Sequence, residues 1–123
     1  MADTTITQAA LDTAAERARQ DAKWGEQNHP DGTGRDESVL YGVATQTNRY
    51  LDYSTAAELA EHATNATNDA AESGTVTWRD ILLEEVFEAL AEDDATKLRT
   101  ELVQVAAVAQ QWAEAIDRRS ARG

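Results

Sequence analysis

The sequence is poor in several residue types, and each shortage narrows what the protein can be. It has no cysteine, which excludes disulfides, thiolate metal sites and cysteine nucleophiles. Aromatic residues make up only 6% of the chain, so a single copy would have a thin hydrophobic core. No segment approaches the roughly eighteen consecutive apolar residues of a membrane-spanning helix. The sequence therefore predicts a protein that neither carries disulfides nor crosses a membrane.

Basic residues are also scarce. The 11 lysines and arginines face 23 aspartates and glutamates, which gives a net charge of −12. Such a charge argues against bulk binding to nucleic acid or to anionic membranes, because that binding depends on neutralising phosphates with Lys and Arg. The first residues lack the positive flank and apolar run of a signal peptide. We therefore expect a soluble, cytoplasmic protein.

The pattern of apolar and polar residues predicts one all-α domain over residues 1–123, built as a helical bundle of four to five helices. No segment shows the alternation of a half-buried strand. The only proline and three of the six glycines fall in a predicted loop over residues 25–36, and residues 120–123 are predicted to form a disordered tail. The predicted helices cover about residues 7–24, 37–51, 55–71, 77–92 and 95–119.

Helix-capping residues mark several of these boundaries. Ser54 or Thr55 can cap the third helix, and Thr77 with Asp80 fits a variant capping box at the start of the fourth. An Asp93-Asp94 turn precedes the last helix. Because Ala dominates the apolar residues, we expect the helices to pack across subunits in a homodimer or homotetramer.

Two acidic motifs are the most informative feature of the chain. Glu84, Glu85 and Glu88 lie on one predicted helix, and Glu101 and Gln104 lie on the next. At 3.6 residues per turn, Glu84 and Glu88 are within ~40° of each other around the axis, and Glu101 and Gln104 are within ~60°. The apolar residues between them indicate core helices rather than acidic tails. The two helices are therefore expected to aim carboxylates at a shared point.

A cluster of this kind needs a counter-ion. Two carboxylates ~5 Å apart repel by roughly 3 kcal/mol at an effective dielectric constant of 20, and a divalent cation removes that cost. Ligands that offer only oxygen favour Mg²⁺, with Mn²⁺ as the alternative, over zinc or copper.

These motifs, together with the run from Glu16 to Gly25, resemble the MazG-like all-α NTP pyrophosphohydrolases. The resemblance covers roughly residues 15–34 and 77–119. It implies a MazG-like bundle that uses Mg²⁺ to convert a nucleoside triphosphate and water into the monophosphate and pyrophosphate. By this resemblance the metal ligands are Glu85, Glu88, Glu101 and Gln104, and the catalytic residues are Glu84 and Glu85. Glu84 would be a further ligand or would orient and deprotonate the attacking water.

Gln104 departs from the family pattern, which has Asp at this position. A neutral amide oxygen can still bind a hard cation, but one negative charge is lost. Either the site binds metal more weakly or another acid substitutes, and Asp80 and Glu92 are the nearest in sequence.

The predicted nucleotide contacts lie near the end of the first helix and in the loop that follows. Lys23 offers a point charge for phosphate and Trp24 a flat apolar surface for a base or ribose. Arg19 and Gln20 lie one turn earlier, and His29 lies in the glycine-rich loop. The alternative interpretation is structural, with Lys23 and Arg19 paired to acids of the same helix and Trp24 packed in an interface.

Two other functions stay open. The chain could be a non-catalytic MazG-fold module that binds nucleotide or a protein partner, with Gln104 as the mark of lost turnover. The Glu26-to-His29 spacing also matches the Glu-x-x-His element of di-iron bundles, but a di-iron site needs two copies on helices and His62 has no acid three residues before it.

Overall fold

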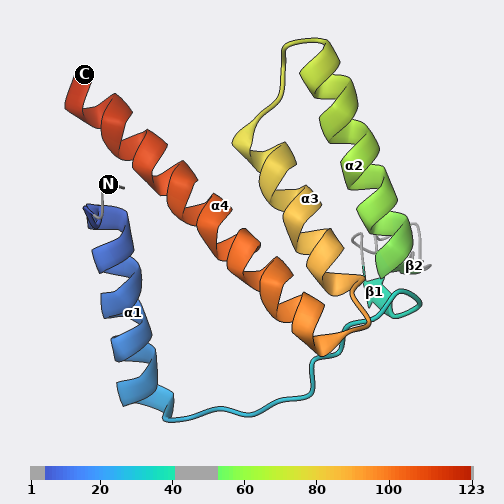
Figure 1. Ribbon diagram of the computed structural model, residues 1–123, viewed down its shortest axis with the longest axis horizontal. Helices are drawn as coiled ribbons and strands as arrows, with labels where there is room; N and C mark the ends of the chain where they lie inside the picture. The colour runs from blue at the N-terminus through green and yellow to red at the C-terminus, as the bar shows by residue number, and fades with distance from the viewer. Residues whose placement is uncertain (1–4, 41–52, 123) are drawn as a thin grey trace, which may run out of the picture. The chain divides into compact units, whose positions relative to one another are not determined.

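The computed structural model describes residues 5–40 and 53–122, and it is built mainly of helices (Figure 1). Its elements, in chain order, are α1 (Gln8–Trp24), β1 (Ser38–Leu40), β2 (Tyr53–Thr55), α2 (Ala56–Glu72), α3 (Trp78–Leu90) and α4 (Ala95–Arg122). The predominantly helical class is thus confirmed. The chain forms two compact units, one of residues 1–30 with 106–123 and one of residues 31–105.

In the first unit, α1 begins and ends as its sequence predicts. Thr7 is the N-cap, and its hydroxyl accepts a hydrogen bond from the Ala10 amide at 3.2 Å. The same hydroxyl donates to Glu114 of α4 at 2.6 Å. Gly25 closes the helix at φ 69°, a conformation that favours glycine, and its amide donates to the Asp21 carbonyl at 2.8 Å.

The second unit contains a short antiparallel pair of strands that the sequence analysis missed. The helix predicted over residues 37–51 is wrong for residues 38–40, which form β1 and pair with β2 in the register Ser38 to Thr55. The rest of that prediction, residues 41–52, lies outside the described residues. The β-branched side chains of Val39 in β1 and Thr55 in β2 suit a pleated, half-buried surface, and pairing with a distant segment overrode the local helical pattern.

Thr55, rather than Ser54, caps α2. Its hydroxyl accepts from the Glu58 amide, and Glu58 reaches back to Thr55, which completes a capping box. The polar centre of α2 stays helical because one of its residues is tied to α3. The Thr67 hydroxyl donates both to the Ala63 carbonyl at 2.9 Å and to the Asp80 carbonyl at 3.2 Å.

The predicted capping box of Thr77 and Asp80 is present at the start of α3. Asp94 caps α4, since its carboxylate accepts from the Lys97 amide at 2.9 Å. The predicted tail is wrong for residues 120–122, because α4 continues as a helix through Arg122. Three arginines in its last turns suit the negative end of the helix dipole.

The loop before β1 is fixed to the end of α3. The Gly34 amide donates to the Leu90 carbonyl at 3.0 Å, and the Arg35 amide donates to the Asp93 carboxylate at 2.9 Å. The first of these bonds satisfies a carbonyl that the C-terminal end of α3 leaves free.

The core is thin. Within the described part of the chain, the buried apolar side chains are Ala9, Ala56, Leu59, Ala89 and Leu98. Three of the five are alanines, which agrees with the expectation from composition. None of the helices in residues 5–40 and 53–122 is long and apolar enough to cross a membrane.

Candidate metal centre

Three of the predicted metal ligands come together between α3 and α4. Glu85, Glu88 and Glu101 each offer a carboxylate oxygen, and these oxygens lie within 4.8 Å of one another. All three residues are half-buried. The spacing of Glu85 and Glu88 places them on adjacent turns of α3, and Glu101 approaches from the first turns of α4.

The environment of the cluster disfavours the ionised forms of Glu85 and Glu88. Partial burial raises the pKa of Glu85, and the charges of Glu101 and Glu84 raise it further. Partial burial also raises the pKa of Glu88, with added repulsion from Glu85, Glu84 and Glu101. A cation placed among these groups would relieve both effects.

Gln104 joins the cluster as a hydrogen-bond donor. With its amide nitrogen turned toward the carboxylates, it lies 3.2 Å from Glu85 Oε2 and 3.1 Å from Glu101 Oε2, and it donates to both. The opposite orientation would set its oxygen against the acids' oxygens, which hydrogen bonding disfavours. Gln104 therefore bridges the carboxylate of Glu85 on α3 and that of Glu101 on α4.

The donor set fits a hard divalent cation. Mg–O distances of about 2.1 Å place opposite ligands of an octahedron about 4.2 Å apart, and Ca²⁺-sized ions place them about 4.6–5.2 Å apart. The upper limit of 4.8 Å on the separations of the three oxygens lies in the range for a Ca²⁺-sized ion, and an Mg²⁺ octahedron requires separations of no more than about 4.2 Å. Three carboxylates from protein would leave other positions for water or phosphate oxygens.

The other acids named in the sequence analysis lie outside this triad. Glu84 is close enough to raise the pKa of Glu85 and of Glu88, but its carboxylate is not one of the three that group together. Asp80 is occupied by the capping box of α3, and its hydrogen bonds from the Thr77 amide and hydroxyl lower its pKa. Glu92 accepts from the amides of Asp93 and Asp94 at 3.2 Å. Neither substitutes for the family's Asp.

The predicted nucleotide contacts lie in the first unit, where several have partners on their own helix. Arg19 forms an ion pair with Glu16 at 2.7 Å, and Gln20 accepts a hydrogen bond from Arg17 at 2.8 Å. The Lys23 ammonium lies 4.9 Å from the centre of the Trp24 ring, a cation–π contact.

His29, in the loop, lies 3.0 Å from the Gln27 side chain. Such surface contacts are weak and would yield to a polyanionic ligand, so a nucleotide role for Arg19, Gln20, Lys23, Trp24 and His29 remains a prediction.

No family model, curated protein or solved structure matches the chain. The resemblance to MazG-like enzymes therefore depends on the residues of the two acidic motifs and of α1 themselves. The convergence of Glu85, Glu88 and Glu101 in space is an observation independent of that resemblance.

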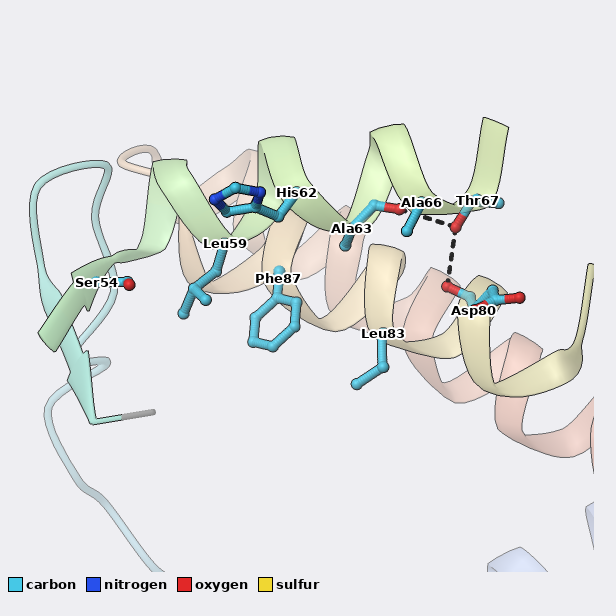
Figure 2. Close-up of a pocket in the computed structure, with 9 residues that line it drawn as sticks. All are labelled: Ser54, Leu59, His62, Ala63, Ala66, Thr67, Asp80, Leu83 and Phe87. Atoms are coloured by element: carbon cyan, nitrogen blue, oxygen red, sulfur yellow. Dashed lines mark hydrogen bonds between the residues drawn. The ribbon is translucent and has the colours of Figure 1, made fainter. Parts of the chain in front are cut away.

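A cavity between α2 and α3 was not predicted. It measures about 370 Å³ and is lined by Ser54, Leu59, His62, Ala63, Ala66, Thr67, Asp80, Leu83 and Phe87 (Figure 2). The signal was present in the sequence as apolar residues at helical spacing on both segments. The same spacing of apolar residues also fits a closed core. Only the packing of the two helices shows that the residues line a groove instead.

Proposed function

We propose that the protein is a Mg²⁺-dependent nucleoside triphosphate pyrophosphohydrolase with a MazG-like bundle. The observation that carries this proposal is the grouping of Glu85, Glu88 and Glu101 from two helices within 4.8 Å. Mn²⁺ is the alternative ion. Bound to this cluster, the metal would neutralise phosphate oxygens and lower the pKa of water.

The side chains have separate roles in this proposal. Glu85, Glu88 and Glu101 hold the cation. The raised pKa values of Glu85 and Glu88 mean that negative charge at these two carboxylates is unfavourable without a cation, and a bound cation offsets that cost. Glu84, next to the triad but outside it, orients the attacking water and accepts its proton. Gln104 holds Glu85 and Glu101 in place through its amide nitrogen or turns its oxygen toward the ion. Contact of Arg19, Gln20, Lys23, Trp24 and His29 with the nucleotide is a separate prediction from the sequence.

The test is a panel of NTPs and dNTPs incubated with Mg²⁺, with release of pyrophosphate as the readout. Wild type should release it from at least one nucleotide, and Glu85→Gln and Glu101→Gln should each reduce the rate by at least about 100-fold. Glu61→Gln, which removes an exposed acid from α2, is the matched control and should keep the wild-type rate. Equal rates for all four proteins would contradict the proposal.

One observation favours a second candidate, a non-catalytic module of the same fold. The Gln104 amide already satisfies two of the three carboxylates by hydrogen bonding, which lowers the gain from binding a cation. Calorimetry separates the two candidates, because a module of this kind would bind nucleotide without turnover. In that case Gln104→Asp should create or increase hydrolysis.

A further inference from the structure

The cavity between α2 and α3 is an open apolar groove rather than part of the acidic cluster. Leu59, Phe87 and Leu83 stand in a row along the two helices, with Ser54 at one end and Thr67 and Asp80 at the other (Figure 2). The side chain of Leu83 is 40% exposed. Exposed leucine beside alanine and phenylalanine is apolar surface that a partner could cover.

The helices that form the groove are strongly acidic. α2 carries Glu58, Glu61, Asp69 and Glu72 without any lysine or arginine, and α3 carries Asp80, Glu84, Glu85 and Glu88 with Arg79 as its single basic residue. The helix pair therefore bears much of the chain's negative charge. Its field attracts cationic ligands and repels anionic ones.

Some of these acids border the groove itself. At about 100° per residue, Asp69 lies about 20° around α2 from His62 and about 60° from Ala66, both of which line the groove. Glu61 lies about 160° from Leu59 and Ala63, on the opposite side of α2. Asp80 lines one end of the groove. Its hydrogen bonds from Thr77 lower its pKa, so it stays charged at neutral pH.

We propose that the α2–α3 groove binds a cationic amphipathic helix from a partner protein. Apolar side chains at i, i+3 or i+4, and i+7 of that helix would cover Leu83 and Phe87 beside the buried Leu59, and lysines or arginines on its flanks would meet Asp69 and Asp80. Residues 59–67 of α2 rise by about 12 Å, the length of about two turns of a bound helix. The groove is thus long enough to accept two or three apolar anchors.

Charge decides between this occupant and the α2–α3 face of a second copy. The second face would bring the same eight carboxylates and single arginine toward the first, and like charges across an interface oppose association. A basic helix is instead attracted by the negative field of α2 and α3. The proposal is independent of nucleotide hydrolysis, and its test uses neither nucleotide nor Mg²⁺.

The experiment measures binding of a fluorescent synthetic peptide to the full chain by anisotropy. The probe is a helix of about 18 residues made of Leu, Ala and Lys with one leucine stripe, and the control peptide has the same composition in scrambled order. The striped peptide should bind at least about tenfold more tightly than the scrambled one. Equal binding of the two peptides, or no binding of either, would overturn the proposal.

Two pairs of variants locate the site. Leu83→Ser should weaken binding at least about fivefold, whereas Val76→Ser, at a residue of similar exposure (43%) before α3, should leave it within about twofold. Asp69→Lys should weaken binding more than Glu61→Lys and reduce its salt dependence. Ala66→Gln adds bulk to the groove at an exposed helical position, and it should also weaken binding if Leu83→Ser proves unstable. If each variant binds like its control, the groove is not the site.

Discussion

At the scale of single residues, the acidic cluster costs the folded chain stability, and the proposed cation would offset that cost. Burial and mutual repulsion raise the pKa values of Glu85 and Glu88, so their ionised forms are less favourable in the folded chain than in the unfolded one. Gln104 offsets part of this cost by donating to Glu85 and Glu101. Removing one charge should therefore stabilise the metal-free protein and weaken the metal site.

Glu85→Gln tests this expectation. In the presence of a chelator at pH 7, we expect its melting temperature to exceed that of wild type by about 2–4 °C. Added Mg²⁺ should raise the melting temperature of wild type and leave the variant nearly unchanged, because ligand binding stabilises only a folded state that binds it. Differential scanning calorimetry with and without Mg²⁺ measures both effects. A lower melting temperature of the variant in chelator would contradict the account of repulsion.

The same variant gives a pH dependence whose sign follows from the pKa values. A carboxylate with a raised pKa in the folded state contributes stability that is present below its unfolded pKa and is lost as pH rises through its folded pKa. The advantage of Glu85→Gln over wild type should therefore grow from the ordinary glutamate pKa upward. Glu114 behaves oppositely, because hydrogen bonds from Thr7 and Gln110 lower its pKa, and its contribution is lost as pH falls.

At the scale of helices and strands, local signals in the sequence predicted much of the fold. The caps at Thr55 and Thr77 needed only neighbouring residues, so the starts of α2 and α3 could be predicted closely. The strands β1 and β2 could not, since each is only three residues long and exists by pairing with the other across the sequence. The hydrogen bond from the Gly34 amide to the Leu90 carbonyl could not be predicted either, since it also joins segments far apart in the sequence.

Substitution of Gly34 tests how much the contact of this loop with the end of α3 contributes to stability. The φ of Gly34 is 146°, and a Cβ at this position would lie 3.1 Å from Asp93 Oδ1. Gly34→Ala should lower the free energy of unfolding by about 1–3 kcal/mol through backbone strain and displacement of the Asp93 carboxylate. Gly32→Ala is the matched control, because Gly32 also has a positive φ (68°) but open space around it. Urea denaturation should show the smaller loss for Gly32→Ala, and equal losses would mean that the contact with Asp93 contributes nothing.

The candidate site shows both what sequence spacing can predict and what it cannot. Helical periodicity was enough to place Glu85 and Glu88 on one face, whereas their pairing with Glu101 was predicted from the short turn between the two helices and from the MazG-like resemblance. It could not tell that the Gln104 nitrogen faces the acids. That outcome depends on hydrogen-bond partners on two helices that only the packed structure brings within reach.

At the scale of the whole molecule, the thin core predicts association. Leu102 and Val103, adjacent on α4, are 51% and 55% exposed. We expect a homodimer or homotetramer in which such residues are covered, and a melting temperature that rises with protein concentration. Sedimentation of wild type and of Val103→Ser over a range of dilutions measures this. A wild-type chain that sediments as a monomer at every concentration would contradict the expectation.

The neutral side chain of Gln104 has a consequence for the electrostatics of a loaded site. Three carboxylates with one divalent ion carry a formal charge of −1, whereas a fourth acid would make it −2. In a molecule whose net charge is already −12, every unit of negative potential near the ion hinders the approach of a polyphosphate. In the proposed enzyme, the Gln104 amide would thus lower the affinity for the cation and also lower the electrostatic barrier to an anionic substrate.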